Sequence, residues 1–130
     1  YHFLYSYAAL LSRKGEYEKS NEILTECQRY FDDCDVQTIV AENHYHLGNW
    51  IRAESHYLTA AHMCPNRFFP LYGVYKIYIV LNDRNKALEI ADRILVKKVK
   101  IPSQTVQHIM EEMRELYYYR FLDRYRSFVS

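Results

Sequence analysis

Residues 48–53 read Gly-Asn-Trp-Ile-Arg-Ala, and two related hexapeptides lie in register with them. Residues 15–20, which begin 33 positions earlier, read Gly-Glu-Tyr-Glu-Lys-Ser, and residues 82–87, which begin 34 positions later, read Asn-Asp-Arg-Asn-Lys-Ala. In each copy the leading Gly or Asn can adopt the left-handed backbone that ends a helix and begins a tight turn. The small residue that closes each hexapeptide suits a close crossing of two helices. The spacing therefore predicts three consecutive helix hairpins of about 34 residues each.

The composition agrees with an all-α fold. The chain of 130 residues has three Gly and three Pro, whereas average usage predicts roughly 15 of them together. Hydrophobic residues make up 49% and charged residues 25%, which excludes disorder and permits the core of one domain. One hairpin cannot bury its apolar face alone, so neighbours must stack. We expect a single domain, a right-handed α-solenoid of hairpins at about 1–33, 34–67 and 68–101, with a capping helix at about 103–128.

The segment from residue 35 to residue 66 resembles a tetratricopeptide repeat (TPR), whose pattern has Gly at the turn, Ala at two crossing positions and Pro at the end. Tyr57 of this segment also matches the pattern, and the first and third copies match less completely. The resemblance implies a protein–protein interaction module rather than an enzyme. The residues that carry the repeat signature are Ala8, Gly15, Gly48, Ala53, Ala60, Pro65 and Ala87.

The periodicity predicts helices near residues 1–14, 16–30, 35–47, 50–63, 69–81 and 84–97, and a seventh helix with Ser103 as its N-cap. Beyond Leu116 the seventh helix is aromatic or apolar nearly all round, which is typical of a helix that something covers. One interpretation is packing against the body of the domain. The other is a weak homodimer formed through Tyr118, Leu122 and Tyr125.

A second resemblance covers the C-terminal half, on the strings at residues 65–72, 86–91, 99–103 and 109–113. These strings are similar to the C-terminal repeat domains of bacterial O-antigen ligase and polymerase-like membrane proteins. The resemblance implies a soluble domain attached to an inner-membrane protein of surface-polysaccharide assembly, on either side of the membrane. No apolar run approaches the roughly 18 residues of a transmembrane helix, so this fragment is not expected to insert into a bilayer itself.

Motifs for catalysis, metal or cofactor binding are missing from the sequence. The six histidines have no HExxH or Cys/His ligand spacing, and three glycines cannot build a phosphate loop. The three cysteines form no CxxC pair, and their odd number suggests free thiols. We expect no metal and no cofactor. Nucleic-acid binding is not expected either at a net charge of +1, although Lys97, Lys98 and Lys100, and Arg120, Arg124 and Arg126 between aromatic residues, keep a helical-repeat RNA binder as one alternative.

The TPR resemblance places ligand contacts on the first helix of each hairpin. The candidate partner-binding residues on this concave face are Tyr5, Arg13, Thr38, Glu42, Tyr45, His46, Phe69, Tyr72 and Lys76. The positions that grip a terminal carboxylate in some TPR proteins hold Tyr5, Ala9, Ile39, Phe69 and Gly73 here, so no carboxylate clamp is expected. An aromatic wall with two charged handles remains, and it suits an apolar or aromatic peptide.

Two other interpretations stay open at this stage. The rings on the first helices could pack only on neighbouring helices, and the chain could be a free-standing TPR scaffold that self-associates through its last helix.

Overall fold

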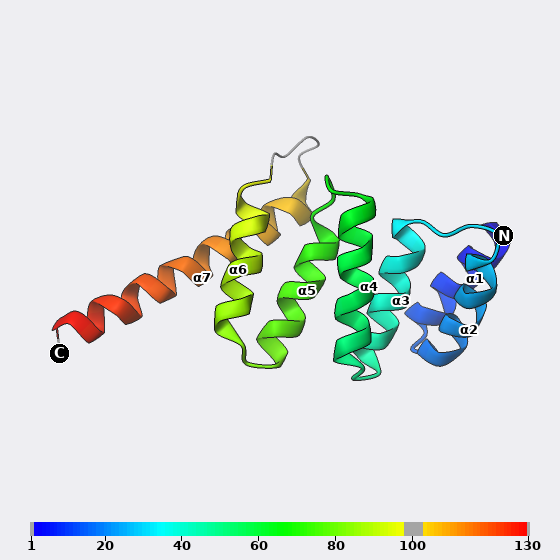
Figure 1. The fold of residues 1–130 in the computed structure, drawn as a ribbon, viewed down its shortest axis with the longest axis horizontal. Coiled ribbons are helices and arrows are strands. Elements are labelled where there is room, and N and C mark those ends of the chain that lie inside the picture. The colour runs from blue at the N-terminus through cyan, green and yellow to red at the C-terminus, as the bar shows by residue number, and fades with distance from the viewer. Residues whose placement is uncertain (1, 98–102, 130) are drawn as a thin grey trace.

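The computed structural model describes residues 2–97 and 103–129, with the side chains of α7 described as far as Tyr118. Over these residues the chain forms seven helices and no strand (Figure 1). The predicted all-α solenoid of helix hairpins is confirmed. The helices are α1 (His2–Arg13), α2 (Tyr17–Gln28), α3 (Cys34–His46), α4 (Trp50–Met63), α5 (Phe69–Val80), α6 (Arg84–Leu95) and α7 (Gln104–Val129).

The helices stack in chain order. Within the hairpins α1 packs on α2, α3 on α4 and α5 on α6, and the hairpins meet where α2 contacts α3 and α4 contacts α5. The first helices also contact one another, α1 with α3 and α3 with α5, so they form a row of their own. The start of α7 packs on α6, and its far end extends away from the stack (Figure 1).

The three hairpin turns share one geometry. Gly15, Gly48 and Asn82 have φ angles of 84°, 78° and 57°. At Gly48 the amide donates to the Tyr45 carbonyl at 3.1 Å, and the next amide, of Asn49, donates to the His44 carbonyl at 2.8 Å. The same pair of bonds recurs at the other two turns. This pattern satisfies helix carbonyls that would otherwise lack donors, and it reverses the chain within two residues.

Small residues allow the close crossings. Ala53, Ala60 and Ala87 are completely buried. In the first hairpin Ser20 and Cys27 occupy the equivalent positions and are buried as well. The Ser20 hydroxyl donates to the Ala8 carbonyl at 2.7 Å. Ser20 therefore has a hydrogen-bond partner although it is buried at a position where the other two hairpins have Ala.

A buried polar group joins the first two hairpins. The completely buried Asn43 of α3 donates through Nδ2 to Ser20 Oγ at 2.9 Å and to Asn21 Oδ1 at 2.8 Å, both on α2. Its Oδ1 accepts from Ser12 Oγ of α1 at 2.6 Å. These hydrogen bonds can form in only one alignment of α1, α2 and α3. They therefore fix the register between the first two hairpins.

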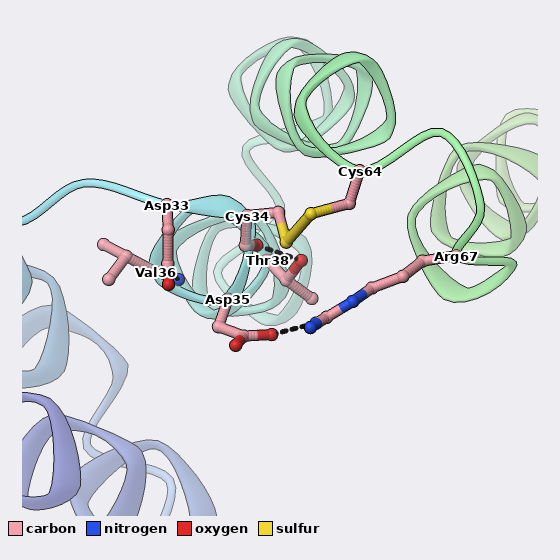
Figure 2. The surroundings of a disulfide bond; sticks show 7 residues. All are labelled: Asp33, Cys34, Asp35, Val36, Thr38, Cys64 and Arg67. Atoms are coloured by element: carbon pink, nitrogen blue, oxygen red, sulfur yellow. Dashed lines mark hydrogen bonds and ion pairs between the residues drawn. A yellow bond between two sulfur atoms is a disulfide. The ribbon is translucent and has the colours of Figure 1, made fainter.

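The expectation of free thiols is wrong for two of the three cysteines. Cys34 and Cys64 form a disulfide (Figure 2), and Cys27 is buried outside the bridge. Cys34 begins α3 and Cys64 follows the last residue of α4, so the open end of this hairpin brings their Cα atoms to 6.2 Å. That separation is within the range that a disulfide spans. Beside the bridge, Arg67 pairs with Asp35 and ties the start of the third hairpin to α3 (Figure 2).

The observed helix ends differ from the predicted ones by up to two residues, most clearly at Gln28, where α2 stops before Tyr30. Side-chain caps set three of the starts. Asp33 accepts from the Val36 amide at 3.0 Å, Asp83 from the Lys86 amide at 3.2 Å, and Ser103 from the Val106 amide at 3.1 Å. Ser103 is therefore the N-cap of α7.

Candidate functional site

A pocket of about 130 Å³ opens between two of the first helices, α3 and α5. Because Glu42 and Tyr45 lie three residues apart, and so do Gly73 and Lys76, each pair points from one face of its helix. The full lining is Glu42, Tyr45 and His46 from α3, Phe69, Tyr72, Gly73 and Lys76 from α5, and Tyr57 from α4.

Tyr57 contributes to the pocket from the second helix of its hairpin. Its side chain is only 4% exposed. Burial, and to a smaller degree the nearby Glu42 and Tyr45, raise the pKa of the Tyr57 hydroxyl above its ordinary value. The hydroxyl therefore stays protonated and can donate a hydrogen bond in this apolar setting.

The pocket carries one charged group of each sign. The Lys76 ammonium lies 5.6 Å from the ring centroid of Tyr45 and 5.5 Å from that of Tyr72, which is the geometry of a cation–π contact. Burial raises the pKa of Glu42 above its ordinary value, while Lys76 acts in the opposite direction. A partly buried carboxyl thus lies beside an exposed cation held over two rings.

A second groove, of about 490 Å³, continues from the pocket between α5 and α7. The two cavities share Tyr72. Burial, and to a smaller degree a hydrogen bond to Glu112, raise the pKa of Tyr72 to about 12. The other residues that line the groove are Thr105, His108, Ile109, Glu111 and Glu115.

The structure brings six of the nine candidate residues together in the pocket and leaves three outside it. Tyr5 packs against the cluster that includes Leu24 and Val36. The Thr38 hydroxyl donates to the Cys34 carbonyl at 2.6 Å. Arg13 is exposed near the end of α1, outside the pocket lining.

Sequence reasoning missed Tyr57 and the start of α7. Tyr57 belongs to a second helix, whereas the candidates were sought on first helices. The start of α7 follows α6 as α5 follows α4, so it takes the place of one more first helix. Extending the repeat by that helix would have predicted the α5–α7 groove.

The histidines do not form a metal site in the described ranges, where no group of three or more His, Cys, Asp or Glu side chains could hold an ion. His44 and His56 nevertheless meet across their hairpin, with ring centroids 5.5 Å apart. His56 Nδ1 lies 2.7 Å from Gln37 Oε1. Burial lowers the pKa of both rings below the ordinary value for histidine.

The basic cluster considered for RNA lies only partly within the described residues. Lys97 donates to the Pro65 carbonyl and so serves a contact within the fold. Lys98 and Lys100 lie outside the described residues, as do the side chains of Arg120, Arg124 and Arg126. In the part of the chain that the structure describes, no helix combines the length and the apolar character needed to cross a membrane.

Comparison with known proteins supports the fold and leaves the family open. No protein-family model matches the chain, and neither does any curated protein. Among solved structures the chain is similar to PcrH, which was crystallised in complex with the chaperone binding region of PopB. The TM-score is 0.75 at 14% sequence identity, over 88% of this chain and 92% of PcrH. The chain therefore has a TPR-like fold.

Proposed function

We propose that this chain is a protein-interaction module that binds an extended segment of a partner protein, with one apolar side chain of that segment in the α3–α5 pocket. The observation that carries the proposal is the convergence of seven first-helix residues from two hairpins on one aromatic pocket. A purely structural role for these rings would favour closing the space between α3 and α5 rather than leaving it open.

The size and chemistry of the pocket favour a single aliphatic or aromatic side chain. Its volume of about 130 Å³ is close to that of an apolar cavity of roughly 150 Å³ that accepts benzene. The Tyr57 hydroxyl, Glu42 and Lys76 are available to hydrogen-bond the backbone of the bound segment. The PcrH structure supports the class of partner, because that protein was solved with a region of another protein bound.

Peptide selection tests this proposal without a known partner. We would select peptides from a random phage-displayed library on the intact chain and measure the affinity of the selected sequences. Truncation of an aromatic hot spot costs about 2 kcal/mol, so Tyr45→Ala and Tyr72→Ala should each weaken binding about 30-fold. Tyr30→Ala, at an exposed position after α2, is the matched control and should bind like the wild type.

Two outcomes of this experiment would contradict the proposal. Selected peptides that bind the folded Tyr45→Ala, Tyr72→Ala double variant with wild-type affinity would move the site away from the pocket, and a library that yields no peptide above background would count against peptide binding.

Self-association through the last helix is the second candidate, and the projection of α7 beyond the stack supports it (Figure 1). Tyr118 is exposed on this helix, while the side chains of Leu122 and Tyr125 lie outside the described residues. Sedimentation velocity of the full chain and of a chain that ends at Leu116 should then give a dimer and a monomer. A full-length monomer at high concentration contradicts this candidate.

The wider setting is proposed on the sequence resemblance alone. A parent membrane protein of surface-polysaccharide assembly would place this module beside the enzyme that transfers the glycan. A helical-repeat RNA binder would instead show salt-dependent binding of single-stranded RNA, and a salt titration separates it from a peptide-binding module.

A further inference from the structure

The groove between α5 and α7 differs in charge from the pocket that it adjoins. Glu111, Glu112 and Glu115 line the groove, and none of the described residues in its lining is Lys or Arg. The pocket between α3 and α5 has instead one carboxyl group, on Glu42, and one ammonium group, on Lys76. The groove is therefore the acidic end of the surface that the two cavities share.

The three carboxyl groups of the groove have no cationic partner within the described part of the chain. Glu111 and Glu112 precede Glu115 by four and three residues, so all three point from one side of α7. Both ion pairs among the described residues join other side chains. Like charges at this spacing repel one another. A positive charge from outside the chain would relieve that repulsion.

Glu112 is the most protected of the three. It is half-buried, whereas Glu111 and Glu115 are exposed. Its Oε2 atom is buried and has no hydrogen-bond partner among the described residues. Solvent screens the charge of such a group less than that of an exposed one, so it attracts a nearby cation more strongly.

The geometry selects among the possible cations. No group of three or more His, Cys, Asp or Glu side chains in the described ranges could hold a metal ion. The phosphates of a nucleic acid carry the wrong sign of charge for this groove. A Lys or Arg side chain fits, because its apolar stem can lie along Tyr72 and Ile109 of the groove while its charged head reaches the carboxyl groups.

We propose that the α5–α7 groove binds a Lys or Arg side chain of the same partner segment whose apolar residue occupies the α3–α5 pocket. This inference rests on the proposed function and adds a sequence requirement to it. Tyr72 lines both cavities, so one segment that crosses this ring contacts both. Neighbouring helices lie about 8–10 Å apart and an extended chain advances about 3.3 Å per residue, which places the basic residue about three residues from the apolar one.

Peptides selected from the random library on the intact chain test this requirement. Those that lose affinity for Tyr45→Ala occupy the pocket, and we expect them to share a Lys or Arg at a fixed distance from their apolar residue. Glu111→Gln with Glu115→Gln should weaken their binding about tenfold. Glu89→Gln with Asp92→Asn, both at exposed positions of α6, removes the same charge outside the groove and should bind like the wild type.

A change in the peptide completes a double-mutant cycle. Exchange of its basic residue for Gln should weaken binding to the wild type about tenfold, and it should have little effect on binding to the Glu111→Gln, Glu115→Gln variant. Sodium chloride at about 0.5 M should reduce the difference between the two chains. A second selection, on Glu111→Lys with Glu115→Lys, should enrich Asp or Glu at the same place in the peptides.

Three results would overturn the inference. Peptides that depend on Tyr45 but not on Glu111 and Glu115 would overturn it and leave the proposed function intact. Peptides that depend on the two glutamates but not on Tyr45 would show that no single segment crosses both cavities. A library that yields no peptide above background would count against the proposed function and this inference together.

The unliganded chain shows whether a basic residue of this chain or of a second copy fills the groove instead. In that case Glu111→Gln with Glu115→Gln would lower the melting temperature, or dissociate a dimer in sedimentation velocity, with no peptide present. Either result would overturn the inference. We expect an equal or higher melting temperature for the variant, because the two substitutions remove a repulsion between like charges.

Discussion

A Cβ atom on Gly73 would lie 2.5 Å from the ring of Tyr57. The ring is buried beside α5, so glycine at this position leaves the room that the ring needs to line the pocket. The shape of the pocket therefore depends on two residues from different hairpins, one of which contributes by having no side chain.

Gly73→Ala measures this relationship. Within a helix, Ala is favoured over Gly by about 1 kcal/mol, but overpacking a core costs about 1–3 kcal/mol. We expect the substitution to lower the free energy of unfolding in the wild type and to raise it by about 1 kcal/mol in a Tyr57→Ala background. Urea denaturation of the four chains of this double-mutant cycle gives the sign in each background. Stabilisation in both backgrounds would mean that the Tyr57 ring does not pack against Gly73.

The partly buried carboxyl of Glu42 makes the stability of the folded chain depend on pH. Burial raises its pKa in the folded chain above the unfolded value, so the folded state binds more protons in the interval between the two values. The free energy of unfolding contributed by this group is therefore highest below about pH 4.3 and falls as the pH rises through the folded pKa. Glu42→Gln removes this dependence.

Denaturant titrations between pH 3 and pH 8 check the sign. Glu42→Gln should gain stability relative to the wild type as the pH rises, and the gain should vanish at the acid end. Glu89→Gln, at an exposed position of α6, is the control and should follow the wild type throughout. A constant difference between Glu42→Gln and the wild type at every pH would contradict the burial of this carboxyl.

The repeat spacing explains why most of the fold could be predicted. Gly48 and Ala53 have roles that depend on local backbone geometry and on side-chain size, and both are visible in a single sequence. Six of the seven pocket residues on α3 and α5 could be proposed together because a period of 33–34 residues aligns the first helices.

The remaining features depend on contacts between helices. Cys34 and Cys64 lie 30 residues apart, and an odd number of cysteines offered no reason to pair them. The hairpin itself brings its two ends together, and that consequence of the predicted topology could have suggested the bridge. The approach of Tyr57 to Gly73 depends on the packing of α4 against α5, which no spacing rule specifies.

The disulfide predicts a response to reductant. The bridge closes a loop of about 30 residues, for which loop-closure entropy gives a stabilisation of about 3–4 kcal/mol. We expect dithiothreitol to lower the melting temperature of the wild type and to leave that of a Cys34→Ser, Cys64→Ser variant unchanged. Thiol titration of the denatured, unreduced chain should find one thiol, that of Cys27. Three reactive thiols would show that the bridge does not form.

The polar group around Asn43 offers the sharpest test of hairpin register. Asn43→Ile puts the residue type of the equivalent Ile77 into α3 and deprives Ser12, Ser20 and Asn21 of their shared partner. Because each buried polar group without a partner costs about 1–3 kcal/mol, we expect the free energy of unfolding to fall by about 2–3 kcal/mol. Asn85→Ile, at an exposed position of α6, should change it by less than about 0.5 kcal/mol.

Making both sides of this contact apolar tests whether the lost hydrogen bonds account for the destabilisation. The further changes Ser20→Ala and Asn21→Leu remove two of the abandoned partners and copy the residue types of Ala87 and Leu88 in α6. When both sides of a polar contact become apolar, the effect on stability can be nearly neutral. The triple variant should therefore recover most of the loss, as measured by urea denaturation. A triple variant as unstable as Asn43→Ile alone would show that α2 and α3 do not meet at these residues.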